Sequence, residues 1–205
     1  MIGYKDFIVH VKEKHRSTIK TSAGIEIHAD SRFSGKETAN TVFEVVEIPM
    51  TYIGVVKKGF QLMVDPTLVM EQSYQLTGHQ ENINLIDRAK SLYKVNKMLI
   101  ICYRENENSP WRGFEDNLIV EKIKEIKASE KTESGLYLVD TAKPVIERGK
   151  AKVLVTNSEL EKQGVFPNDI VFINEQYVVD IRIDGIKYSW VKDRHVLAVE
   201  LKEAM

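Results

Sequence analysis

ASEKTESGLYLVDTAKPVIERGKAK, residues 128–152, carries an apolar patch at Gly135-Leu136-Tyr137-Leu138-Val139 inside a polar run that proline and glycine interrupt. This composition is typical of a loop and not of a strand that is buried on both faces. On its two sides, residues 118–126 and 151–156 alternate apolar and polar side chains, as half-buried strands do. A connection this long between two strands is unusual, and such loops are generally functional or disordered. We therefore expect a long mobile loop whose apolar tip contacts a partner.

The composition narrows the class of protein. The chain has 205 residues and 43% hydrophobic content, which suits one large domain or two small ones. Lys plus Arg number 29 against 30 for Asp plus Glu, and the net charge of −1 supplies no field for nucleic acid or an anionic membrane. No segment approaches the roughly 20 apolar residues that span a bilayer, and residues 1–15 lack a signal-peptide layout. We expect a soluble cytoplasmic protein that binds neither nucleic acid nor membrane.

Strand-like segments follow one another along the whole chain, so the fold class predicted is all-β. Alternating or β-branched runs are found at residues 6–13, 41–48, 60–64, 93–103, 118–126, 151–156, 170–173, 177–183, 186–190 and 196–201. Asn96-Lys97 is expected to break the fourth of these runs. Residues 67–92 keep no clear period, and residues 81–90 are compatible with a short helix.

Residues 105–117 have the polar, Pro- and Gly-containing composition of a linker or domain boundary. Trp111 and Phe114 lie within this segment, and we expect them to pin the two halves of the chain together. Cys102 is the single cysteine of the sequence, so an internal disulfide is excluded, and this fits a reducing compartment. It lies in an apolar run. We interpret Cys102 as a small core residue and not as a nucleophile.

The order of parts in the second half repeats that in the first. Aligned features keep nearly constant offsets: Gly24 and Gly135 (135 − 24 = 111), Gly59 and Asn168 (168 − 59 = 109), and Leu99 and Val196 (196 − 99 = 97). The fall in offset predicts extra residues in the first copy. We predict a first domain at 1–105 with an insertion around 67–92, a linker at 106–116, and a second domain at 117–205.

The second copy resembles the GroES (ten-kilodalton chaperonin) family of co-chaperonins. The resemblance rests on five pieces in the family's order: Val120-Glu121-Lys122-Ile123-Lys124, Ser134-Gly135-Leu136-Tyr137-Leu138, Arg148-Gly149-Lys150-Ala151-Lys152-Val153-Leu154, Asn168-Asp169-Ile170-Val171-Phe172 and Asp193-Arg194-His195-Val196-Leu197-Ala198-Val199. The first copy fits more loosely, through residues 21–27, 58–63 and 96–101. The resemblance implies two tandem, small, partly open antiparallel β-barrels, each with a long mobile loop.

In the family, such barrels form a ring whose loops dock onto a GroEL-type chaperonin and close its folding chamber over unfolded client proteins. The resemblance implies that Gly135, Leu136, Tyr137 and Leu138 bind the chaperonin, and that the equivalent segment of the first copy does so through Gly24, Ile25 and Ile27. Glu26 departs from the apolar centre of the family tripeptide. ATP is bound by the partner, so no catalytic residue and no cofactor are expected in this chain. Short connections at residues 48–59 and 157–166 suggest an open roof, as in phage-encoded members, which act in the host cytoplasm.

Other classes of function have weaker support. His10, His15, His28, His79 and His195 show no spacing typical of metal ligands, so no metal site is predicted. A zinc alcohol dehydrogenase-like enzyme needs a Gly-rich dinucleotide fingerprint and a parallel α/β half, and neither pattern is present. The alternative to a co-chaperonin is a structural or virion-associated oligomeric β-barrel protein that does not bind a chaperonin.

Overall fold

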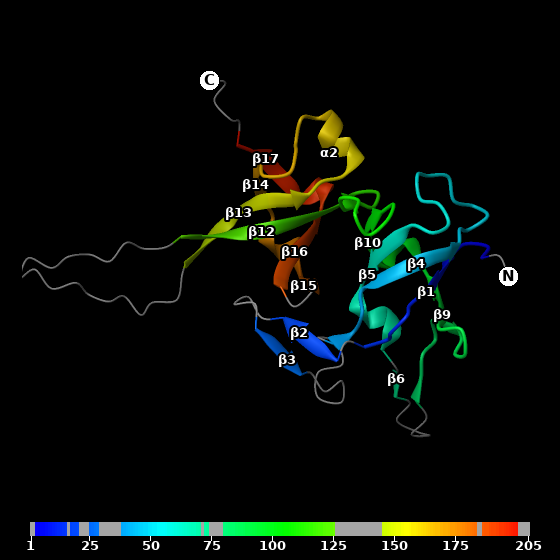
Figure 1. Ribbon diagram of the computed structural model, residues 1–205. Coiled ribbons are helices and arrows are strands. Elements are labelled where there is room, and N and C mark those ends of the chain that lie inside the picture. Colours follow the sequence, from blue (N-terminus) through cyan, green and yellow to red (C-terminus); the bar gives the residue numbers. More distant parts are fainter. Residues whose placement is uncertain are drawn as a thin grey trace, which may run out of the picture.

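The computed structural model describes residues 3–15, 17–20, 25–28, 38–70, 72–73, 80–125, 145–183 and 186–200. Two antiparallel sheets, one from each half of the chain, make up most of this part of the molecule, and Figure 1 shows them as two adjoining lobes. The predicted all-β fold is confirmed. No helix among the described residues has the length and apolar character needed to cross a membrane.

The first sheet has seven strands in the order β11-β10-β5-β4-β1-β9-β8. Its strands are β1 (Phe7–His10), β4 (Val42–Glu47), β5 (Gln61–Val64), β8 (Leu85–Asp87), β9 (Leu92–Val95), β10 (Ile100–Arg104) and β11 (Arg112–Gly113). Two separate pairs, β2 (Thr18–Lys20) with β3 (Glu26–His28) and β6 (Gln72–Ser73) with β7 (Gln80–Glu81), lie in the connections, together with the 3-10 helices η1 (Pro66–Val69) and η2 (Lys97–Leu99).

The second sheet has six strands in the order β15-β16-β12-β13-β14-β17. Its elements are β12 (Asn117–Glu125), β13 (Val145–Val155), β14 (Ile170–Ile173), β15 (Val179–Ile183), β16 (Ile186–Lys192) and β17 (Val196–Val199), with α2 (Ser158–Lys162), η3 (Glu175–Tyr177) and η4 (Asp193–His195) between them. The short helix α2 begins where the Asn157 side chain accepts hydrogen bonds from the Glu159 and Leu160 amides at 3.1 and 2.9 Å.

The two sheets share one strand order. Reading β8-β9-β1-β4-β5-β10 against β15-β16-β12-β13-β14-β17 matches every strand of the second sheet, and β11 is the additional strand of the first. Even the irregularities repeat: the register of β1 against β4 shifts between Ile8 and Val9, and that of β12 against β13 shifts between Ile119 and Val120. The internal repeat predicted from the offsets is therefore present in the hydrogen-bonded strands.

Each sheet packs one face into its own core. The first core contains the following buried side chains: Phe7, Val9, Val11, Ala39, Phe43, Val45, Val56, Leu62, Val64, Leu68, Val69, Tyr93, Val95, Ile100 and Phe114. The second contains Leu118, Val120, Ala151, Val153, Leu160, Val165, Val171, Ile173 and Val191. In both sheets the members of one strand are mostly two residues apart, which is the period that places side chains on one face.

The segment predicted as a linker is tied to both sheets. Phe114 is buried in the first core, where its ring lies 6.1 Å from that of Phe7 and 6.2 Å from that of Tyr52. The Gly113 amide donates to the Thr156 carbonyl at 2.8 Å, and Trp111 packs against apolar residues of both sheets. The expected pinning role of the two aromatic residues is confirmed. Because β11 lies inside this segment, part of it also belongs to the first sheet.

Of two local expectations, one differs from the structure and one is confirmed. Residues 81–90 are not helical: they include the end of β7 and all of β8, which pairs with β9. Cross-strand pairing outweighs the weak helical pattern there. The break expected at Asn96-Lys97 is confirmed, because the Asn96 side chain accepts from the Met98 amide at 3.0 Å and starts η2. The predicted domain bounds stay a prediction.

Candidate functional site

The two predicted docking segments belong to equivalent connections of the repeat. Residues 11–41 join β1 to β4 in the first sheet, and residues 126–144 join β12 to β13 in the second. Since β1 matches β12 and β4 matches β13, the two segments leave their sheets from equivalent pairs of strands. This placement was predicted only from sequence offsets, and the strand order supports it independently.

The first connection contains the hairpin of β2 and β3, in which Ile19 pairs with Ile27. Ile25 is 63% exposed and Ile27 is 52% exposed, so both predicted anchors present apolar surface to solvent. Surface apolar residues that stand two apart on an extended segment lie on one side of it. Gly24, the third predicted residue of this segment, lies outside the described residues.

The second connection leaves from the two longest strands among the described residues, β12 and β13. Figure 1 shows β12 and β13 running side by side away from the rest of the second sheet, up to residues 125 and 145. Gly135, Leu136, Tyr137 and Leu138 lie outside the described residues, so their docking role stays a prediction. What the structure describes is the base from which this connection starts.

A bulge near the base of this hairpin depends on Gly149. The register of β12 against β13 shifts between Lys122 and Lys124, and Gly149 in the opposite strand has a φ of +71°. Its amide donates to the Glu175 carboxylate at 2.8 Å. A Cβ at this position would lie 3.2 Å from the Ile173 carbonyl oxygen. Glycine is therefore favoured here for its backbone conformation, which an L residue adopts only with strain.

Ion pairs and a hydrogen bond centred on Asp180 of β15 connect β12, β15 and β16. The Asp180 carboxylate lies 3.3 Å from Lys122 Nζ and 2.7 Å from Lys187 Nζ, and it accepts from the Ser189 hydroxyl at 3.0 Å. Burial acts to raise the pKa of Asp180, but the hydrogen bonds from Lys187 and Ser189 and the charge of Lys122 outweigh it and leave the pKa below its usual value. Asp180 therefore stays ionised, and its ion pair with Lys122 links β12 to β15.

Chemistry of a catalytic kind finds little support in the part of the chain that the structure describes. Cys102 is free and buried, and burial raises the pKa of its thiol, which opposes formation of the nucleophilic thiolate. The searched residues include no group of three His, Cys, Asp or Glu side chains that could hold a metal ion. The candidate site consists of the two apolar segments on equivalent connections.

One surface was not predicted from sequence. Met63, Ile101 and Cys102 project from the first sheet and are buried against Ile119 and Ile181 of the second. Met63 stands between Leu62 and Val64, both members of the first core, so its side chain faces the opposite way. The alternation of residues 60–64 indicates that the Met63 side chain points away from the first core. It does not indicate which residues of the second sheet cover that side chain.

Sequence comparison with known proteins finds a matching family and several relatives. The family model described as Chaperonin 10 Kd subunit matches residues 110–200. The co-chaperonin GroES of Coprothermobacter proteolyticus is 32% identical over 82 residues, which covers 38% of this chain and 84% of the relative. That of Aquifex aeolicus is 33% identical over 93 residues, covering 43% and 75%. That of Deinococcus radiodurans is 32% identical over 89 residues, covering 41% and 92%. The chain is therefore a member of the chaperonin 10 Kd subunit family, the family of the GroES co-chaperonins.

Proposed function

We propose that this protein is a co-chaperonin that assembles into a ring and caps a GroEL-type chaperonin, acting indirectly on the unfolded proteins inside. The observation that carries the proposal is that apolar segments occupy the same connection in both copies of the repeated strand order, with Ile25 and Ile27 exposed in the first. The names of the relatives, each a co-chaperonin GroES, point the same way.

Binding through such segments is weak for each segment and strong for the ring. Burying one Leu or Ile side chain contributes about 1.5–3 kcal/mol. Ordering a flexible segment on binding offsets much of that gain. Several segments on one ring bind together, because each bound segment raises the effective concentration of the next. Weak individual contacts also let the cap dissociate when the chaperonin changes state.

In this proposal the catalytic reaction takes place in the partner chaperonin. The chaperonin binds and hydrolyses ATP, and this chain contributes apolar contacts and a lid, without a cofactor or a catalytic residue of its own. The protein would act in the cytoplasm, where the chaperonin is present. Leu136, Tyr137 and Leu138 are the main proposed anchors, and Ile25 and Ile27 supply two further ones with Glu26 between them.

The ATPase of a purified GroEL-type chaperonin tests the proposal. Adding the wild-type protein should lower the steady-state rate, and the effect should saturate at a fixed ratio of chains to chaperonin. The variant I25S/I27S separates the two segments: a partial loss of inhibition assigns anchors to both, and full retention assigns docking to residues 135–138 alone. An unchanged ATPase at saturating wild-type protein contradicts the capping role and favours the structural, non-binding alternative.

A further inference from the structure

A pocket of about 520 Å³ lies in the first lobe, away from the candidate docking segments. One wall comes from residues 48–60, which join β4 to β5, and the other from the end of β10 and the segment that leads to β11. Figure 1 shows these two connections on the same side of the first lobe. Residues 48–60 follow β4, whereas residues 11–41 precede it, so the pocket and the first docking segment lie at opposite ends of this strand.

The pocket depends on the segment that joins the two repeats. Its second wall includes β11, which has no counterpart among the described strands of the second sheet. The match to the chaperonin 10 Kd subunit family begins at residue 110, and most of the lining residues precede that position. The pocket therefore lies mostly outside the region that the family match covers. Its volume is within the range of about 300–1,000 Å³ that is typical of small-molecule sites.

Both walls are held by backbone hydrogen bonds of their own. In the first wall, the Phe60 amide donates to the Lys57 carbonyl at 3.2 Å, and Gly59 within this turn has a φ of +84°, which glycine adopts without strain. In the second wall, the Ser109 amide donates to the Asn106 carbonyl at 3.1 Å. The pocket is thus formed before any ligand enters it, as ligand sites usually are.

Arg104 supplies a positive charge that is fixed in position. Its Nε donates to the Gln61 side-chain oxygen at 2.7 Å, and its Nη1 donates to the Glu107 backbone carbonyl at 3.0 Å. Its guanidinium carbon lies 4.4 Å from the centre of the Trp111 ring. All three partners are uncharged groups, so they orient the guanidinium without neutralising it.

Arg112 supplies a second guanidinium, on the other strand of the pair. Tyr103 of β10 pairs with Arg112 of β11, and side chains of directly paired residues lie on the same face of a sheet. Burial raises the pKa of the Tyr103 hydroxyl, and the charge of Arg112 and a hydrogen bond from it partly offset that rise. The hydroxyl is therefore protonated at neutral pH and lies next to a cation.

Positive charge and apolar surface meet in this pocket. The lining has three cationic side chains and one carboxylate: Lys57, Arg104, Arg112 and Glu105. Their formal sum is +2 (3 − 1), although the whole chain carries −1. Like charges gathered at one concave surface attract an anion. The same wall that carries Lys57 also presents Phe60 and Val55, whose side chain is 60% exposed. A ligand that fits both properties has an anionic group and an apolar body.

We infer that this pocket binds a small organic anion, with its carboxylate or phosphate group between Lys57 and Arg112 and its apolar body against Val55 and Phe60. Hydrogen bonds from cationic donors to a carboxylate or phosphate are stronger than those between neutral groups, and a guanidinium can make two in parallel. The site goes beyond the proposed function, because it lies apart from the docking segments and its ligand needs no chaperonin.

Isothermal titration calorimetry of the full chain tests the site with two probes, phenyl phosphate and phenylacetate, at low ionic strength. At least one of them should bind at one site per chain, and the affinity should fall when salt is added. The tighter of the two identifies the preferred anionic group. Benzyl alcohol, which lacks the charge, should not bind, and inorganic phosphate, which lacks the ring, should bind more weakly than phenyl phosphate. Failure of both ring-bearing anions to bind, or equal affinity for either control compound, would overturn the inference.

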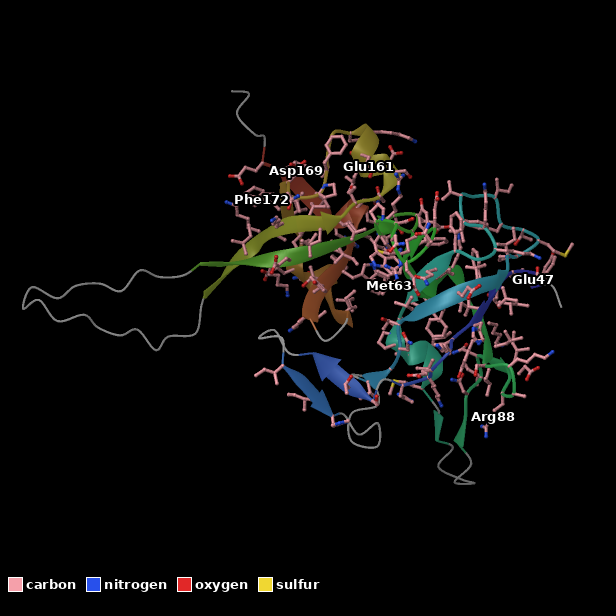
Figure 2. All side chains as sticks on the ribbon, viewed as in Figure 1. Glu47, Met63, Arg88, Glu161, Asp169 and Phe172 are labelled. Atoms are coloured by element: carbon pink, nitrogen blue, oxygen red, sulfur yellow. The ribbon has the colours of Figure 1, made fainter. Side chains whose placement is uncertain are left out.

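Single variants locate the bound probe. Lys57→Gln and Arg112→Gln should each weaken binding about three- to tenfold, and Glu105→Gln should strengthen it, because it removes the lining carboxylate. Lys58→Gln is the matched control: Lys58 pairs with Glu47 at 2.6 Å, and Figure 2 shows Glu47 at the outer side of the first lobe. All four side chains are exposed, so the fold should be retained, which circular dichroism checks. An equal loss of affinity in Lys58→Gln, or weaker binding in Glu105→Gln, would contradict a site in this pocket.

Discussion

Phe114 lies in the connecting segment, and its side chain stabilises the first sheet. Its replacement by Ala tests this contact between the segment and the first core. The side chain is contributed by the segment just before β12, yet it is buried in the core of the other sheet, in edge-to-face contact with Phe7 and stacked on Tyr52. Replacing a buried Phe by Ala typically costs about 3–5 kcal/mol, and the loss of two aromatic contacts adds to that cost. We expect Phe114→Ala to lower the free energy of unfolding of the first sheet by about this amount.

Denaturant unfolding measures the effect, and the two tryptophans make it specific. Trp111 and Trp190 both pack in the contact between the sheets, so their emission reports that contact, while far-ultraviolet circular dichroism reports the strands. The variant should show a lower midpoint by both probes. The matched control is Phe166→Ala, since Phe166 is about half exposed and its loss should cost less than about 1 kcal/mol. Equal, small losses in the two variants would refute the account of Phe114 as a shared core residue.

Three further predictions concern backbone and charge. Gly113→Ala places a Cβ against the backbone carbonyl of Asn117, so it should lower the unfolding free energy by about 1–3 kcal/mol and redshift the tryptophan emission; an unchanged spectrum counts against a rigid connection. Gly149→Ala forces an L residue to a φ of +71° and should cost about 1–2 kcal/mol in thermal or denaturant unfolding, a prediction that a neutral result contradicts. Asp180→Asn should cost under about 1 kcal/mol at pH 7. The pKa of Asp180 is lowered in the folded state, so the contribution of this carboxylate to the free energy of unfolding is present above the unfolded-state pKa of about 3.9. That contribution is lost as the pH falls through the folded-state pKa, so the unfolding free energies of variant and wild type should converge in acid.

Much of the fold followed from patterns that are local in sequence. Residues 170–173 were predicted as a strand and form β14, and the capping side chain of Asn96 accounts for the break between β9 and β10. The internal repeat was visible because equal offsets survive wherever both copies keep the same strands. The offset of Leu99 to Val196 is one residue too large, since the registers place Val196 opposite Ile173 as Ile100 is opposite Val64. Bulges shift such alignments, and composition does not reveal them.

The parts that could not be predicted depend on which surfaces meet. Nothing in the run of residues around Met63 distinguishes an outward apolar side chain that is covered by a neighbouring sheet from one that is exposed, as Phe172 is. Likewise, the linker composition around Phe114 gave its pinning role but not which core it enters. These are properties of contacts between distant segments, and one sequence alone carries little information about them.

Complex formation with a purified GroEL-type chaperonin tests the central claim most directly, measured by native mass spectrometry with and without nucleotide. The wild-type protein should form a nucleotide-dependent complex. The variant L136S/L138S should lose that complex while its free oligomer keeps the wild-type mass, because the change removes docking anchors and not the ring contact. Failure of the wild-type protein to bind in any nucleotide state would contradict the co-chaperonin role, and unchanged binding by the variant would contradict the docking role of residues 136–138.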